Sequence, residues 1–217
     1  MTDQPNPTSV RLNELLERVG LAPLDVPTAD RFAAYCALLL RWNARTNLTA
    51  IRDEQGILSR HFVESIACAR ALPPGIASLL DFGSGAGFPG IPIALCRPEI
   101  SVALVESQGK KAAFLREAAR TLDLPIDVHS TRAETLRAKF DCVTLRAVDQ
   151  MSAAVQVATH LLASGGWLAL MTTAPELAGL KLVLDPQFRF TAQVPMPGVR
   201  IAGGAGRILA LAQCSAA

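Results

Sequence analysis

The sequence contains no apolar run long enough to cross a membrane. Half of its 217 residues are hydrophobic, yet no stretch approaches the roughly 18 consecutive apolar residues that a spanning helix needs. The opening residues MTDQPNP are polar and lack the apolar segment of a secretory signal. We therefore expect a globular protein with an ample core, located in the cytoplasm and without a membrane partner.

Cysteine is sparse, and its spacing does not suggest a framework of cross-links. The five cysteines are odd in number, widely spaced and mostly embedded in apolar runs. This pattern favours buried free thiols over disulfides or a zinc site. The sequence also lacks a cluster of metal ligands and a pairing of nucleophile with base. No metal and no catalytic dyad are therefore expected.

Net charge is low, at +2, but the basic residues are unevenly distributed. The segment from Arg31 to Arg52 contains four arginines and no acid. It favours a local basic surface that could meet nucleic acid. A solvated helix end followed by a loop would have the same composition, so both interpretations stay open.

The chain begins with helical patterns and continues with alternating strands and helices. Helices are predicted over 8–19, 28–42 and 53–72, so residues 1–73 should form a helical extension. The pattern of residues 74–217 is typical of a parallel α/β sheet. Its predicted helices are 88–96, 109–122, 151–163 and 176–184, and its predicted strands are 78–82, 101–106, 126–129, 140–146, 166–171, 188–194 and 207–212, the last two joined by the Pro- and Gly-rich stretch 195–206.

Three alternating glycines follow the first predicted strand, in the segment LLDFGSGAGFPGIP of residues 79–92. A strand, a tight turn and a helix make a cofactor-binding loop, because glycine lets the backbone approach a ligand and the helix N–H groups face the same space. Phe88 stands where a dinucleotide fingerprint needs its third glycine, which argues against NAD. Asp81 could accept hydrogen bonds from loop amides or hold a ligand's ammonium group.

A second acid, Glu106, ends the next predicted strand. It lies about one strand–helix–strand repeat after Asp81, where a carboxylate can accept both hydroxyls of a ribose. The two acids fit a nucleoside that carries an amino acid and no phosphate, which describes S-adenosylmethionine. A flavodoxin-like or Rossmann turn with acids placed by chance is the alternative.

Several short motifs follow one another along the chain. They are Trp42-Asn43, Asn47-Leu48-Thr49, Arg60-His61, Ser65-Ile66, DFGSGAGFPGIP from Asp81, Arg97-Pro98-Glu99, ESQGKK from Glu106, Phe114-Leu115, Phe140-Asp141 and Arg146-Ala147. Together they resemble the bacterial 16S ribosomal RNA guanine-N7 methyltransferases, also called glucose-inhibited division protein B. The resemblance extends from about residue 32 to residue 170.

The resemblance implies a class I S-adenosylmethionine-dependent methyltransferase, with a Rossmann-like seven-stranded sheet whose last pair is antiparallel. It implies methyl transfer to N7 of a guanine in 16S rRNA, within the small ribosomal subunit, by a monomer. Guanine N7 has a lone pair and no proton, so attack needs no general base. The enzyme's task is in-line placement in a water-poor pocket.

The cofactor site is expected beyond the carboxyl ends of the strands, where open parallel sheets bind ligands. The glycine loop would line the methionine part, Phe88 would pack on it, and Glu106 would hold the ribose. The backbone of Ala133 and Glu134 would read the adenine edge. The full set of expected cofactor contacts is Asp81, Gly83, Gly85, Gly87, Phe88, Glu106, Ala133, Glu134 and Arg146.

Arg146 ends the fourth predicted strand and should meet an anion, because a buried unpaired charge is costly. The candidates are Asp81, Glu106, the cofactor carboxylate and a substrate phosphate, and the cofactor carboxylate ranks first. A surface salt bridge is the plainer alternative.

An RNA partner would be held through its phosphates, with binding that falls steeply as salt rises. His61 could touch RNA or the cofactor region, and a packing role is equally compatible with its position. Asn47 could cap a helix or bond to the nucleotide. The expected RNA contacts are Arg41, Arg45, Asn47, Arg52, Arg60, His61, Lys110 and Lys111.

The chain departs from the family pattern at two places. Thr172-Thr173 stand where the family usually has a lysine–glycine pair, and Gly206-Arg207 stand where it usually has glutamate–arginine. Two other functions therefore remain open. One is a methyltransferase that acts on another acceptor, and the other is a ribosome-assembly module that binds RNA without catalysis.

Overall fold

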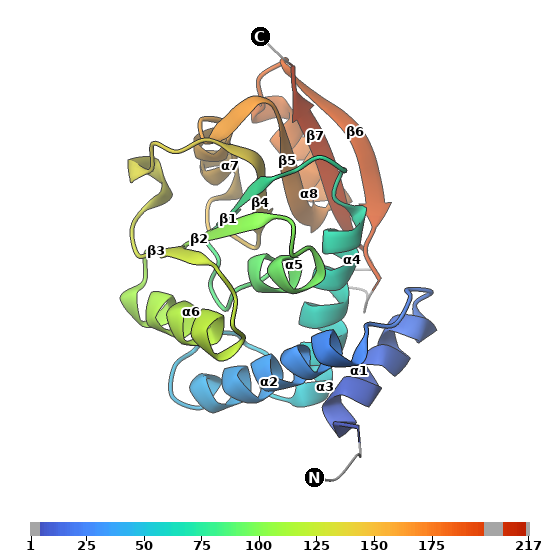
Figure 1. Cartoon of the computed structure of the whole chain (residues 1–217). Helices are drawn as coiled ribbons and strands as arrows, with labels where there is room; N and C mark the ends of the chain where they lie inside the picture. Colours follow the sequence, from blue (N-terminus) through green and yellow to red (C-terminus); the bar gives the residue numbers. More distant parts are fainter. Residues whose placement is uncertain (1–4, 198–205, 216–217) are drawn as a thin grey trace.

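The computed structural model describes residues 5–197 and 206–215, and a single mixed sheet lies at its centre (Figure 1). Six of the seven strands run parallel, and β7 is antiparallel to both of its neighbours. The strand order is β3-β2-β1-β4-β5-β7-β6. The strands are β1 (Ser78–Phe82), β2 (Ser101–Val105), β3 (Asp127–His129), β4 (Phe140–Arg146), β5 (Leu162–Thr173), β6 (Phe188–Pro195) and β7 (Arg207–Cys214).

This sheet confirms the predicted class I methyltransferase fold, including the antiparallel last pair. The order reverses between β1 and β4, which makes their carboxyl ends the switch point where such sheets bind ligands. β5 begins earlier than predicted, because Leu162 already pairs with Phe140 ahead of a register shift. Most of the predicted connection 195–206 lies outside the described residues.

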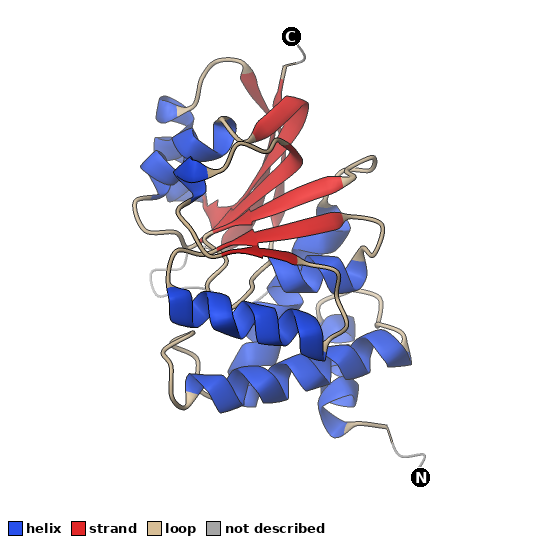
Figure 2. Ribbon diagram, turned by 60° about the vertical axis from the view of Figure 1, so that its left-hand side comes forward, coloured by secondary structure: helices blue, strands red, loops and turns tan. Residues whose placement is uncertain are grey.

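Helices cover both faces of the sheet (Figure 2). Successive strand residues point to opposite faces: Leu79 packs in the core with α4, α5 and α6, whereas Leu80 packs with α7 and α8. The helices on the first face are α4 (Val63–Ala71), α5 (Gly90–Cys96) and α6 (Gly109–Thr121), and those on the second are α7 (Met151–Thr159) and α8 (Ala174–Val183).

Two further helices complete the first face: α2 (Val26–Asn43) lies outside α5 and α6, and α1 (Pro7–Arg18) packs on α2 and beside α4 (Figure 1). Their apolar side chains, including Phe32 and Tyr35, belong to the same core as Leu79 of the sheet. Arg31 of α2 donates hydrogen bonds to the backbone carbonyls of Leu122 and Asp123 at the end of α6. The extension therefore shares a core with the sheet, and a domain boundary at residue 73 remains a prediction.

The extension's first two helices begin slightly before the predicted positions. Asn6, rather than Thr8 or Ser9, caps α1 and accepts the N–H of Thr8. Asp25, rather than Thr28, caps α2 and accepts the N–H of Thr28. In each helix a proline occupies one of the first two positions, where its missing N–H costs nothing, so the cap precedes it.

The third predicted helix is interrupted by a π-helical turn. Asp53 caps α3 (Glu54–Gly56) as predicted, a π segment follows over Ile57–Phe62, and α4 completes the run. Segments of π-helix are rare and frequent at functional sites. This one carries Arg60 and His61, both of which contact Arg146 at the end of β4.

Among the described residues, no helix combines the length and apolar character that crossing a membrane would require.

Candidate active site

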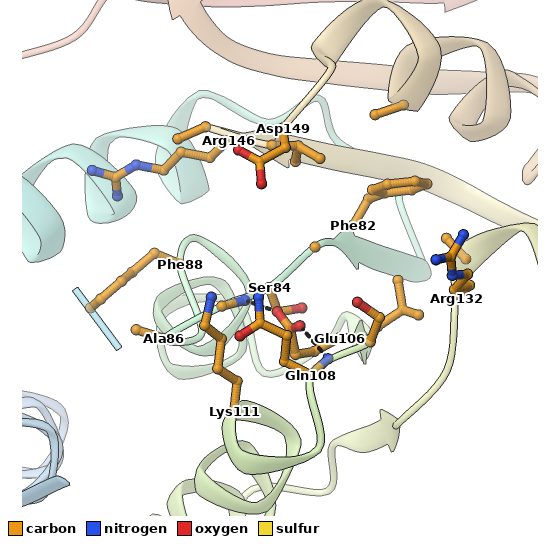
Figure 3. Close-up of a pocket in the computed structure, with 18 of the residues that line it drawn as sticks. Phe82, Ser84, Ala86, Phe88, Glu106, Gln108, Lys111, Arg132, Arg146 and Asp149 are labelled. Atoms are coloured by element: carbon orange, nitrogen blue, oxygen red, sulfur yellow. Dashed lines mark hydrogen bonds between the residues drawn. The ribbon is translucent and has the colours of Figure 1, made fainter. Parts of the chain in front are cut away.

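A cavity of about 610 Å³ lies at the carboxyl ends of β1, β2 and β4, at the switch point of the sheet. This volume is in the usual range of small-molecule sites. Figure 3 shows Arg146 and Asp149 on one side of the cavity, and Glu106 and Gln108 on the opposite side. The loops that follow β1, β2, β3 and β4 all contribute to the wall.

The glycine loop forms the floor and is built on left-handed backbone. Gly83, at φ +67°, lines the cavity, and a side chain there would be strained whatever the space around it. Gly87, at φ +90°, has a different reason to be glycine, since a Cβ would lie 2.7 Å from the Tyr35 hydroxyl and close to Ile91. The Tyr35 hydroxyl donates a hydrogen bond to the carbonyl of Ala86, so α2 supports the loop from below.

Asp81 supports the same loop and does not line the cavity. Its carboxylate accepts the N–H of Gly90 at 3.2 Å and the Thr144 hydroxyl at 2.9 Å, and the residue is 1% exposed. Of the two predicted roles, the structure therefore displays the bond to a backbone amide. Burial raises the pKa of Asp81 to about 6, against the lowering effect of these hydrogen bonds.

Glu106 follows β2 and presents a fixed carboxylate to the cavity. Its Oε2 accepts the N–H of Gly85 at 3.0 Å, and its Oε1 accepts the N–H of Gln108 at 2.7 Å. The side chain thereby ties the glycine loop to the start of α6. Each carboxylate oxygen can accept a second hydrogen bond, so the group can still receive ligand hydroxyls.

Phe88, His61 and Arg146 form a stacked corner of the cavity. The Phe88 and His61 rings are 4.6 Å apart between centroids and nearly parallel, and the Arg146 guanidinium lies 5.8 Å from the Phe88 centroid. Nδ1 of His61 faces Nη2 of Arg146, a donor, at 3.2 Å, so the ring proton belongs on Nε2, which bonds to Thr49. Burial, followed by the nearby arginines, lowers the pKa of His61 to about 3, so the ring is neutral.

Arg146 meets an anion that the sequence analysis did not consider. Its Nη2 donates to Oε2 of Glu64 at 2.8 Å, and the two side chains are 6% and 2% exposed. Arg146 also donates to the carbonyl of Arg60 and the hydroxyl of Ser65. An acid inside the apolar run FVESIACA is the one sequence signal that could have identified Glu64.

The predicted adenine contacts lie together in a short turn. Ala133 and Glu134 belong to the 3₁₀ segment Ala133–Thr135, and both line the cavity. All the predicted cofactor residues except Asp81 and Gly87 thus meet in one cavity. Gln108, Asp149 and Gln150 also line it, and no motif in the sequence indicates a role for them.

The predicted RNA contacts are more dispersed. Among them, His61 and Lys111 line the cavity. Arg45 and Lys110 are exposed. Two of the other arginines have side-chain partners, since Arg41 pairs with Glu117 at 2.9 Å and Arg52 donates to the Asn47 side chain at 2.7 Å. Arg60 accepts a bond from Arg146 through its backbone carbonyl, which does not involve its guanidinium.

A second cavity of about 750 Å³ adjoins the first and shares Ala147, Val148, Gln150 and Ala153 with it. It extends toward the end of β5, the start of α8 and Arg207 of β7. Both places where the chain departs from the family pattern lie here. Thr172 and Thr173 donate hydrogen bonds to the Glu176 carboxylate at 2.8 and 3.1 Å, and Arg207 lines the wall.

Comparison with known proteins agrees with this architecture. Residues 28–181 match the family described as rRNA small subunit methyltransferase G. The "Ribosomal RNA small subunit methyltransferase G" of Stenotrophomonas maltophilia (strain K279a) is 41% identical over 205 residues, which cover 92% of this chain and 94% of that protein. The protein of the same description from Roseiflexus sp. (strain RS-1) is 51% identical over 136 residues, covering 59% of this chain and 58% of its own length.

Solved structures share the fold at low sequence identity. TYW2 of M. jannaschii, solved in complex with AdoMet, superposes with a TM-score of 0.60 at 14% identity, covering 73% of this chain and 78% of that chain. TrmN from Thermus thermophilus superposes with a TM-score of 0.54 at 23% identity, covering 72% of this chain and 53% of that chain.

The solved structures share the class I methyltransferase fold, and the family match over residues 28–181 together with the 41% identical relative defines the protein as a methyltransferase that uses S-adenosylmethionine. Within that class, the chain belongs to the rRNA small subunit methyltransferase G family.

Proposed function

We propose that this protein transfers a methyl group from S-adenosylmethionine to N7 of a guanine in 16S rRNA. The observation that carries the proposal is the cavity at the switch point, where the glycine loop and the Glu106 carboxylate face the same space in a chain of this family. The acceptor is the small ribosomal subunit, and the enzyme acts as a monomer in the cytoplasm.

The residues of the first cavity fit the cofactor in size and chemistry. Gly83 and Gly85 would leave the backbone open to the methionine part, Glu106 would offer acceptors to the ribose, and the turn at Ala133 and Glu134 would lie beside the adenine; all five residues line the cavity. Arg146, held by Glu64 at the edge of the cavity, would attract the cofactor carboxylate. S-adenosylmethionine supplies the electrophilic methyl group, and the protein supplies the placement.

No side chain needs to remove a proton from guanine N7, because that nitrogen carries a free lone pair. The neutral His61, fixed between Thr49 and Arg146, stiffens the corner beside the cofactor without adding charge to it. The apolar face of Phe88 keeps water away from the same corner. Catalysis then depends on alignment of the methyl group with N7.

The acceptor base enters from the second cavity, which adjoins the first along the loop after β4. Exposed basic residues, Arg45 after α2 and Lys110 at the start of α6 among them, contact phosphates of the RNA outside the cavities. The modest net charge of +2 implies limited affinity for isolated RNA. A folded or protein-bound target compensates by offering a shaped surface.

Methyl transfer from labelled S-adenosylmethionine tests this proposal. The acceptors are 30S particles and deproteinised 16S RNA from a strain that lacks this gene. We expect label in at least one of the two, confined to one guanine. Cofactor binding without label in either acceptor would contradict the proposal and point to a different acceptor.

A further inference from the structure

One buried carboxylate lies between the two cavities. Oε2 of Glu64 accepts the Nη2–H of Arg146, which lines the first cavity, at 2.8 Å. Oε1 of the same group lies 3.8 Å from Nε of Arg207, which lines the second. Glu64 comes from α4, outside both cavities, and its side chain is 2% exposed.

The two arginines carry like charges that repel each other, and the Glu64 carboxylate between them offsets this repulsion. The positive charge of Arg207 acts on Arg146 and lowers its pKa, in addition to the larger effect of burial, while Glu64 acts in the opposite direction. A buried charge that loses its partner is strongly destabilising. Glu64 thus lies against two guanidinium groups, that of Arg146 in the first cavity and that of Arg207 in the second.

Arg146 is held by more side-chain bonds than Arg207. Arg146 also contacts Ser65, the Arg60 carbonyl and His61, so its position is fixed from several directions. Among the residues that the structure describes, Nε of Arg207 is buried without a hydrogen-bond partner, and its side chain is 22% exposed. Within the part of the chain that the structure describes, Glu64 is the acid that lies within 4 Å of Arg207, while Glu176 acts on it from farther away. We therefore expect the charge of Glu64 to contribute most to the orientation of Arg207.

We propose that Glu64 is a positioning residue that couples the cofactor cavity to the acceptor cavity. Through Arg146 it orients the donor side of the reaction, and through Arg207 it orients the acceptor side. This inference rests on the proposed function, since it places the acceptor base in the second cavity. It predicts that a substitution of Glu64 changes the affinity for both S-adenosylmethionine and the RNA acceptor, although Glu64 lines neither cavity.

Glu64→Gln removes the charge and keeps the shape, and steady-state kinetics would separate its effects. We expect the KM for S-adenosylmethionine and the KM for the RNA acceptor both to rise, each by roughly fivefold or more, as is usual for coupled sites. Arg207→Gln should raise the acceptor KM alone. In the double variant, the acceptor KM should equal that of Glu64→Gln, because Arg207 has already lost its orientation.

Two controls distinguish positioning from loss of structure. Glu54→Gln breaks an ion pair with Arg11 that lies outside both cavities, and it should leave both KM values unchanged. Glu64→Asp keeps the charge and should recover part of both affinities. If Glu64→Gln melts below the assay temperature, Glu64→Asp takes its place in the double comparison with Arg207→Gln, because its shorter side chain moves the carboxylate away from both arginines.

Two results would overturn the inference. One is a Glu64→Gln variant that raises only one of the two KM values. The other is a double variant whose fold-increase in acceptor KM equals the product of the increases in the two single variants. These outcomes differ from a failure of the proposed function, in which the unchanged enzyme itself labels no RNA. In that case the second cavity would no longer be assigned to the RNA acceptor.

Discussion

Single carboxylates at the ends of β1 and β2 have separate tasks, although the sequence presents them as a pair. Asp81 is enclosed and bonds to Gly90 and Thr144, beneath the loop. Glu106 reaches the cavity and bonds to Gly85 and Gln108. We therefore expect substitution of Asp81 to affect mainly stability, and substitution of Glu106 to affect mainly cofactor binding.

Glu106→Gln should weaken S-adenosylmethionine binding by about 10- to 100-fold, because hydrogen bonds to a charged group contribute about 1.5–3 kcal/mol. The amide nitrogen of the new side chain would also face a backbone N–H. Isothermal titration with the cofactor measures the change. Glu99→Gln, on an exposed residue just before β2, is the matched control. An unchanged Kd for Glu106→Gln would contradict the ribose assignment.

Asp81 should make the free energy of unfolding depend on pH. Its pKa is raised to about 6 from an ordinary value of 3.8, so between these values the folded state binds more protons than the unfolded state. Stability contributed at this site therefore falls as pH rises from about 4 to about 6, by about 3 kcal/mol in order of magnitude. Urea unfolding of the wild type and of Asp81→Asn across this range measures the difference. A difference that stays constant or grows with pH would contradict the assignment.

The loop between β1 and α5 is the element on which the cofactor site is built. It is held from below by Tyr35 of α2 and from the side by Glu106, so segments distant in sequence fix its shape. Its glycines are required for different reasons, with Gly83 facing the cavity and Gly87 facing the core. Stability should therefore be most sensitive on the core side of the loop.

Gly87→Ala should destabilise the protein by about 2–5 kcal/mol, the sum of left-handed backbone strain and overpacking against Tyr35 and Ile91. Gly109→Ala, at the start of α6, has no atom within 4 Å of the added Cβ and should be neutral or slightly stabilising. Chemical denaturation of the two variants gives the comparison. Equal stabilities would show that the loop tolerates a side chain at residue 87.

The helical extension shares the core on one face of the sheet, and the cofactor site lies where that core meets the one on the opposite face. The π-helical turn before α4 brings Arg60, His61 and Glu64 to Arg146, so the extension completes the site. Exposed basic residues lie on the loop after α2 and at the start of α6, among them Arg45 and Lys110. They should determine affinity for RNA without touching the cofactor.

Arg45→Gln and Lys110→Gln should each weaken RNA binding and reduce the slope of log K against log salt, by about 0.7 to 0.9 for each phosphate that the variant no longer neutralises. Cofactor affinity should not change. Arg189→Gln, on the edge strand β6, is an exposed basic control that should leave the slope unchanged. Filter binding across a salt series measures all three variants. Slopes that match the wild type would remove these residues from the RNA surface.

The strands and the glycine loop were predictable because their signals are local. An apolar run, an acid and alternating glycines lie within residues 79–92, and the predicted strand at 78–82 coincides with β1. The Arg146–Glu64 pair was not predictable in this way, since its members are 82 positions apart and join a strand to a helix. The π turn that aligns them has no periodic signature either. The second cavity likewise depends on tertiary packing of four elements.

Chemical identification of the methylated base is the most direct test of the central claim. Small-subunit RNA from cells lacking the gene would be incubated with the enzyme and labelled S-adenosylmethionine, then digested to nucleosides and separated. The account predicts label in 7-methylguanosine, and its loss with Glu106→Gln. Label in any other nucleoside, or in protein, would contradict it.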